Sequence, residues 1–239
     1  MILGTLLAMT LSPNLGPETF QARAKDWRIG PVIYQVFVDR FFPPRNPIAK
    51  AKFFTGPRKL RNWDELPKGG TFLPEVGLWS HELEFWGGDL PGVQSKLGYI
   101  SKLGADVLYL TPIHQALTNH RYDAQDYLKV APEFGTGKDL DRLISGTHGA
   151  KMRIVLDGVF NHVGRTSDLF QQASKNPKSP RRDWFYFGKE YKTGYRAWAG
   201  VGNLPALNLE SRRVQDYIWR SKNSVVRHYL NRGIDGWRL

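Results

Sequence analysis

Residues 87–112 read GGDLPGVQSKLGYISKLGADVLYLTP, and this stretch decides the fold. Its first half predicts a helix, because apolar residues recur at helical spacing. These residues are Val93, Leu97, Ile100 and Leu103. Asp89 precedes the helix as a cap, and Gly104 ends it. Residues 105–110, ADVLYL, are an almost continuous apolar run, as is typical of a strand buried on both faces.

Three further units surround this stretch. Residues 32–38 predict a buried strand, and a long loop follows to about Trp86. A strand over 152–156 follows a short helix with three apolar residues, which are Leu140, Leu143 and Ile144. A helix over 211–231 then leads into a fourth strand in GIDGWRL, and its apolar face holds Val214, Ile218, Val225 and Tyr229. Alternating strands and helices predict an α/β fold with a parallel sheet, either half of an eight-stranded barrel or a small open sheet.

Composition narrows the class of protein. The chain has 239 residues, of which 41% are hydrophobic, so it is long enough to bury a substantial core. Lys plus Arg number 34 against 22 Asp plus Glu, which gives a net charge of +12. A basic polyanion binder is therefore an alternative, but the basic residues are dispersed and no nucleic-acid motif accompanies them, so we expect no nucleic-acid partner. The absence of cysteine excludes disulfides and thiolate catalysis.

The N-terminal residues 1–26 predict a leader or a signal segment. Residues 1–11, MILGTLLAMTL, resemble the apolar core of a secretory signal, and ARA at 22–24 is a candidate cleavage site. However, the basic region that normally begins such a signal is missing. The apolar run is also too short to span a bilayer, so we expect no membrane partner. Secretion, a periplasmic location and a cytoplasmic location all stay open.

Polar side chains follow the predicted strands, and the carboxyl ends of parallel strands are where α/β folds build their sites. Asp39 and Arg40 follow the first strand, and HRYDAQDY at 120–127 follows the second. The third strand is followed by Asp157, Asn161 and His162. Each segment alone could be a turn held by its Asp and Asn side chains. Together they predict one site at one end of the sheet.

Seven stretches in order carry a family resemblance: YQVFVDRF, GGDLPGV, LYLTPI, HRYDAQDYLKVAPEFGT, DGVFNHVG, LPALNLE and GIDGWRL. From about residue 29 to 239 the chain resembles the α-amylase family, glycoside hydrolase family 13. The stretches SPRRDWFYF and NLPALN are most similar to the neopullulanase, cyclomaltodextrinase and maltogenic-amylase branch. The resemblance implies the N-terminal half of a (β/α)8 TIM barrel, with about four strands. Its parts would be the first part of the barrel (27–162), an inserted irregular domain B after strand three (163–211), and the third helix with the fourth strand (212–239).

The implied activity is cleavage of α-glucans such as starch, maltooligosaccharides, cyclodextrin and pullulan, with retention. A carboxylate attacks the anomeric carbon while a glutamic acid protonates the leaving oxygen. The resemblance places that nucleophile at position 240 and the acid further on, so we expect residues 1–239 to be inactive alone. They would need the C-terminal half of the barrel, or self-association. The alternatives are a fragment of a glucan transferase and a non-catalytic, carbohydrate-binding or complementing half.

The resemblance also implies roles for single residues. Tyr122 would stack on the reacting sugar, His162 would donate to it, and Asp123 and His120 would lie in the same subsite. Arg238 would keep the nucleophile ionised. Asp157 would be a buried support of the site. Asn161 would be a positioning residue or a ligand of a structural calcium ion. No other cofactor is implied.

Departures from the family pattern occur at three positions near the expected cleft, which are Arg121, Ala199 and Ala206. They leave bond preference and acceptor subsites open. Aromatic residues of the insertion could be platforms for sugar rings or could equally pack its core. They are Trp184, Phe185, Tyr186 and Trp198.

Overall fold

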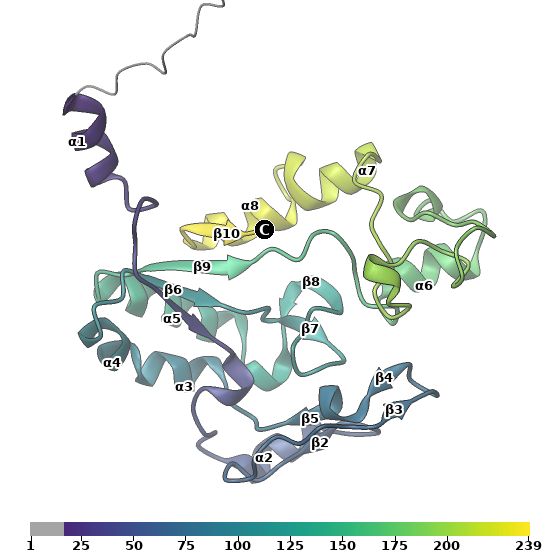
Figure 1. Cartoon of the computed structure of the whole chain (residues 1–239), viewed down its shortest axis with the longest axis horizontal. Helices are drawn as coiled ribbons and strands as arrows, with labels where there is room; N and C mark the ends of the chain where they lie inside the picture. Colours follow the sequence, from purple (N-terminus) through teal and green to yellow (C-terminus); the bar gives the residue numbers. More distant parts are fainter. Residues whose placement is uncertain (1–16) are drawn as a thin grey trace, which may run out of the picture.

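A computed structural model describes residues 17–239, and its centre is a parallel sheet of four strands. The order along the sheet is β1 (Ile33–Val36), β6 (Val107–Leu110), β9 (Arg153–Asp157) and β10 (Gly236–Arg238). Every neighbouring pair is parallel, so all the strands end at the same edge. In Figure 1 this edge faces the β7–β8 hairpin (His114–Ala116 and Ala124–Val130). The predicted parallel α/β arrangement is confirmed.

The helical stretch before β6 is two short helices rather than the single predicted one. They are α3 (Leu90–Ser95) and α4 (Leu97–Lys102), separated at Lys96. The predicted cap is confirmed, because the Asp89 carboxylate accepts from the Gly92 backbone N–H at 2.7 Å. The placement of Leu103 on the buried face was wrong: α4 ends before it, and its side chain is 53% exposed.

The helix before β9 forms as predicted. It is α5 (Gly137–Gly149), and its three apolar residues are buried in the core. Thr136 begins it with a capping box, in which the Thr136 hydroxyl accepts from the Asp139 N–H and the Asp139 carboxylate accepts from the Thr136 N–H.

The continuous helix predicted over 211–231 is broken. The chain forms α7 (Arg212–Gln215), a π-helical turn η7 (Asp216–Arg220) and then α8 (Val225–Arg232). Ser221 has an extended backbone, and the Ser224 side chain caps α8 by accepting from the Arg227 N–H. The four apolar residues predicted on one face are all buried. Their spacing was informative, but local serine chemistry broke the helix.

The remaining elements are short. The first strand ends earlier than predicted, because η1 (Val38–Arg40) begins at the last residue of the expected range 32–38. The predicted long loop then holds α2 (Pro47–Lys50), η2 (Ala51–Phe53), β2 (Lys59–Leu60), β3 (Phe72–Leu73), β4 (Leu78–Trp79), η3 (Ser80–Leu83) and β5 (Glu84–Phe85). After β8 comes η4 (Pro132–Phe134), and the predicted insertion holds α6 (Asp168–Lys175), η5 (Arg182–Trp184) and η6 (Trp198–Gly200). The rest of the insertion is irregular and is joined by isolated β-bridges. Its boundaries as a separate domain stay a prediction.

The N-terminal part of the described chain is α1 (Pro17–Lys25), which stands apart from the sheet in Figure 1. The apolar stretch 1–11 of the predicted leader lies outside the described residues. Within residues 17–239, no helix has the length and apolar character needed to cross a membrane.

Candidate functional site

A cavity of about 810 Å³ lies where β9 and β10 end. Its lining includes most of the predicted site residues: His120, Tyr122, Asp157, Asn161, His162 and Arg238. Tyr122 and His162 therefore face the same space. The side chains come from the loop before β8, from the end of β9 and the segment after it, and from β10. A parallel sheet brings these distant segments together because its strands end side by side.

Asp157 forms the floor of the cavity and is 2% exposed. Its carboxylate accepts hydrogen bonds from the hydroxyls of Tyr109 and Tyr122, the latter at 3.1 Å. Burial, together with the Asp157 carboxylate, raises the pKa of both tyrosines, so they remain hydroxyl donors at neutral pH. This network fixes the Tyr122 ring.

Arg238 is aligned beside Asp157 by the pairing of the last two strands. Its guanidinium lies 3.5 Å from the Asp157 carboxylate, whose charge raises the pKa of the arginine. The Arg238 side chain is 58% exposed, so its remaining donors face the cavity.

His162 is neutral and held by two neighbours. Its Nε2 lies 3.1 Å from the Tyr122 carbonyl oxygen, and its Nδ1 lies 2.8 Å from the Asn161 side-chain nitrogen. Because a carbonyl accepts and an amide nitrogen donates, the imidazole proton resides on Nε2. Burial lowers the pKa of His162 to about 4. The Nε2 proton, which the resemblance implies is donated to a sugar, is thus already donated to the Tyr122 carbonyl oxygen.

This histidine predicts a pH dependence of stability. Because its pKa is lower in the folded chain than the ordinary 6.5, the unfolded state binds more protons between pH 6.5 and 4. We expect the free energy of unfolding to fall as the pH drops through this window, with His162 contributing at most about 3 kcal/mol. Urea unfolding at pH 7 and pH 4.5 measures it. The loss should be smaller in His162→Asn, and an identical loss in both chains would contradict the assignment.

Of the four candidate sugar platforms, only Trp198 lines the cavity. It is 50% exposed, and its ring lies 5.6 Å from the His162 ring. Trp184 and Phe185 are buried in the hydrophobic core that the insertion shares with the sheet and its helices. Tyr186 lies beneath the Arg196 guanidinium, outside the cavity lining.

The structure does not bring Asp123 to the cavity. Asp123 is 1% exposed, and its carboxylate accepts from the backbone N–H groups of Leu117 and Thr118 and from the Thr118 hydroxyl. It therefore holds the turn that carries the cavity residues. His120 does line the cavity, with its Nε2 3.1 Å from the Glu82 carboxylate.

Glu82 also lines the cavity and was missed by the sequence reasoning. It lies in the 3-10 turn η3, inside the predicted long loop, where no strand or motif marked it. Its other carboxylate oxygen accepts from the Trp79 N–H at 2.6 Å. Glu82 joins the predicted site residues through its contact with His120, which lies 38 positions further along the sequence.

None of the three departures from the family pattern lies in the lining of the cavity. Arg121 is fully buried and turns away from the cavity. Ala206 is 6% exposed and lies behind His162, with which it forms a β-bridge. Ala199 follows Trp198 and has a positive φ of 47°, so it sets the turn that presents the tryptophan.

Asn161 lines the cavity, and its side-chain nitrogen contacts His162 while its side-chain oxygen is the atom that could bind calcium. Among the described residues, no three Asp, Glu or His side chains gather as metal ligands. Calcium requires six to eight oxygen ligands. The structural calcium ion therefore stays a prediction.

A family model and individual known proteins place the chain in the same family. A family model, alpha amylase catalytic domain, matches residues 35–239. The chain is 40% identical to a cyclomaltodextrinase from a Bacillus species, over 95% of this chain and 38% of that protein. It is 36% identical to an intracellular maltogenic amylase of Bacillus subtilis, over 93% of this chain and 34% of that protein. The chain thus spans little more than a third of these relatives.

The fold has solved counterparts. The cyclic α-maltosyl-(1→6)-maltose hydrolase from Arthrobacter globiformis superposes with a TM-score of 0.73 at 33% identity. The match covers 90% of this chain and 44% of that one.

Proposed function

The chain belongs to the α-amylase family, and from this premise we propose that it is the part of an α-glucan hydrolase that builds one wall of the substrate cleft. The observation that carries the proposal is the cavity at the end of β9 and β10. It combines an exposed aromatic face, Trp198, with polar groups from Tyr122 and Arg238. Sugar-binding sites need this combination, because hydroxyls require hydrogen bonds while ring C–H faces favour aromatic surfaces.

The roles proposed for these residues follow from their contacts. The Asp157 carboxylate, held in place by the hydroxyls of two tyrosines, supplies a fixed negative charge beneath the reacting sugar, which favours a cationic transition state. Arg238 holds and keeps ionised a carboxylate supplied from outside residues 1–239. Retaining cleavage then requires that carboxylate as nucleophile and a second one as acid. The substrates proposed are starch, maltooligosaccharides, cyclodextrin and pullulan.

The proposed partner is the C-terminal half of a barrel, or a second copy of the chain. Among the described strands, β1 and β10 are the edges of the sheet, and Ile33 in β1 is 57% exposed. Open strand edges pair readily with further strands. A glucan transferase would use the same cavity, while a non-catalytic binding half would hold glucan without ever gaining turnover.

Glucan binding tests the proposal. We expect residues 1–239 to bind maltoheptaose in calorimetry, and Trp198→Ala to weaken that binding about tenfold by removing the stacking face. Trp219→Ala is the matched control, because Trp219 is also exposed, at 39%, but lies outside the cavity lining.

Absence of maltoheptaose binding would reject the proposed function. Equal losses in the two tryptophan variants would reject the role of Trp198. Salt-sensitive binding of duplex DNA without any glucan binding would favour a polyanion binder.

A further inference from the structure

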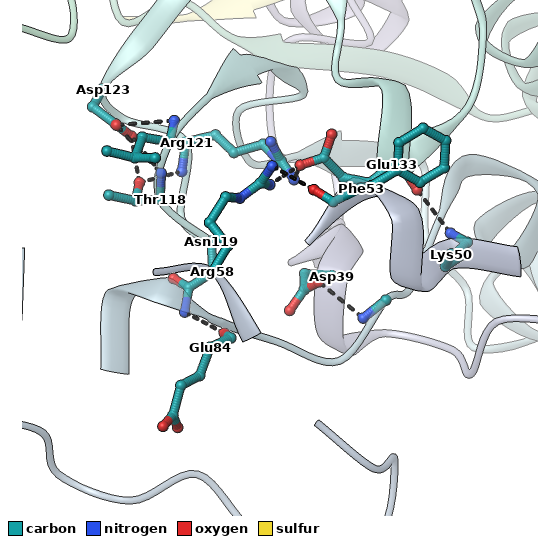
Figure 2. Close-up of polar contacts among 12 residues, drawn as sticks. Asp39, Lys50, Phe53, Arg58, Glu84, Thr118, Asn119, Arg121, Asp123 and Glu133 are labelled. Atoms are coloured by element: carbon teal, nitrogen blue, oxygen red, sulfur yellow. Dashed lines mark hydrogen bonds and ion pairs between the residues drawn. The ribbon is translucent and has the colours of Figure 1, made fainter. Parts of the chain in front are cut away.

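The turn at 117–123 sends successive side chains in opposite directions. His120 and Tyr122 face the cavity, whereas Asn119 and Arg121 face away from it. The Asn119 side chain donates to the backbone carbonyls of His81 and Glu84, at 2.8 Å each. Figure 2 shows Asn119 pointing toward Glu84 on one side, and Arg121 pointing toward Glu133 on the other. The cavity-facing residues are thus set between anchors that face away from it.

Arg121 has an unfavourable backbone, with φ at +61°. Residues other than glycine rarely adopt this region, so the surrounding contacts must hold it there. Its guanidinium donates to the Glu133 carboxylate at 2.9 Å and lies 4.0 Å above the Phe134 ring. Glu133 also pairs with Arg58, which comes from the distant segment before β2. Arg58, Arg121 and Glu133 thus form a buried triad, which holds the backbone of Arg121 at its positive φ.

Tyr122 follows Arg121 directly and makes two contacts in the cavity. Its hydroxyl donates to Asp157 at 3.1 Å, and its carbonyl accepts from His162 at 3.1 Å. A change of the backbone at Arg121 would displace both contacts, because the peptide between the two residues is rigid.

We propose that Arg121 is a positioning residue, whose ion pair with Glu133 holds Tyr122, and with it His162, in the geometry that receives a sugar. Arg121 touches no part of the cavity itself. The part of this inference that concerns sugar rests on the proposed function. The part that concerns the turn does not, so the two can be tested separately.

The experiment uses Arg121→Gly in the chain of residues 1–239. Glycine accepts a positive φ without strain, and Glu133 keeps Arg58 as its partner, so the substitution removes the anchor without stranding a charge. We expect faster hydrogen exchange in residues 117–123, unchanged exchange in α5, and about tenfold weaker maltoheptaose binding. Arg121→Lys keeps the charge but not the planar, forked guanidinium. It should restore part of the slow exchange in residues 117–123 and part of the maltoheptaose affinity.

Lys151→Gly is the matched control, because Lys151 is also basic with φ of +61° but is exposed and remote from the cavity lining. It should leave exchange in 117–123 unchanged. Wild-type exchange there in Arg121→Gly would overturn the inference, as would equal acceleration in α5. If Arg121→Gly does not fold, hydrogen exchange in residues 117–123 of Arg121→Lys tests the inference instead. Faster exchange than in the unmodified chain supports it, and unchanged exchange overturns it. If the unmodified chain binds no maltoheptaose, the proposed function fails, while the exchange still decides whether Arg121 holds the turn.

Discussion

Replacing Glu133 by alanine is expected to lower the free energy of unfolding by about 4 kcal/mol. Glu133 is 4% exposed and is the counterion of two arginines, Arg58 and the fully buried Arg121. Burial by itself would raise the pKa of the Glu133 carboxyl, but the charges of Arg121 and Arg58 lower it overall. Without this carboxylate, two guanidinium groups would repel each other in a poorly solvated place.

Urea unfolding at pH 7 measures the effect, and Glu65→Ala is its matched control. Glu65 also pairs with an arginine, Arg61 at 3.7 Å, but at the surface, where such a pair contributes about 0–1 kcal/mol. Similar losses in the two variants would show that water reaches the triad.

The acid sensitivity of the triad has a definite sign. Because its pKa is depressed in the folded chain, the Glu133 carboxyl stabilises the fold above its ordinary pKa of 4.5. This stability is lost as the pH falls further. The His162 effect begins at higher pH, and a parallel titration of His162→Asn separates it from the effects of Glu133 and of the buried His114.

Sequence pattern predicted the two central strands well, because buried parallel strands are apolar without interruption. The runs that become β6 and β9 lie within one or two residues of the expected bounds. The predicted burial of the first strand was wrong at its start, because β1 is an edge strand and Ile33 is 57% exposed. Helix continuity was predicted less well. Periodicity reports which face is buried, and it persists across the break between η7 and α8, where Ser221 and Ser224 stop and restart the helix.

The site was predictable where residues end a strand or follow it within a few positions, as Asp157 and His162 do. It was not predictable where side-chain direction or a distant contact decides the role. Asp123 and Arg121 flank Tyr122 in sequence but are both buried away from the cavity. Glu82 enters the site only through His120, and no local pattern encodes that pairing.

Residues 1–239 alone are expected to show no turnover of maltooligosaccharides, cyclodextrin or pullulan. Retaining cleavage needs a free nucleophilic carboxylate and an acid about 5–5.5 Å apart across the scissile bond. The acidic residues among those described that line the cavity are Asp157 and Glu82, and both are engaged. Asp157 holds two tyrosines, and Glu82 holds the Trp79 N–H and His120.

The decisive measurement is product formation by the purified chain under conditions where it binds maltoheptaose, so that an unfolded protein is not mistaken for an inactive one. Turnover that persists through purification and disappears in His162→Ala would contradict the expectation, because that residue lies in the cavity and a contaminating enzyme would not respond to it. Binding without turnover would leave Arg238 in a defined role. Its exposed guanidinium is aligned by β10 beside Asp157, where it can hold a carboxylate contributed by another segment of barrel. The chemistry would then depend on joining that carboxylate to a cleft wall that residues 1–239 already provide.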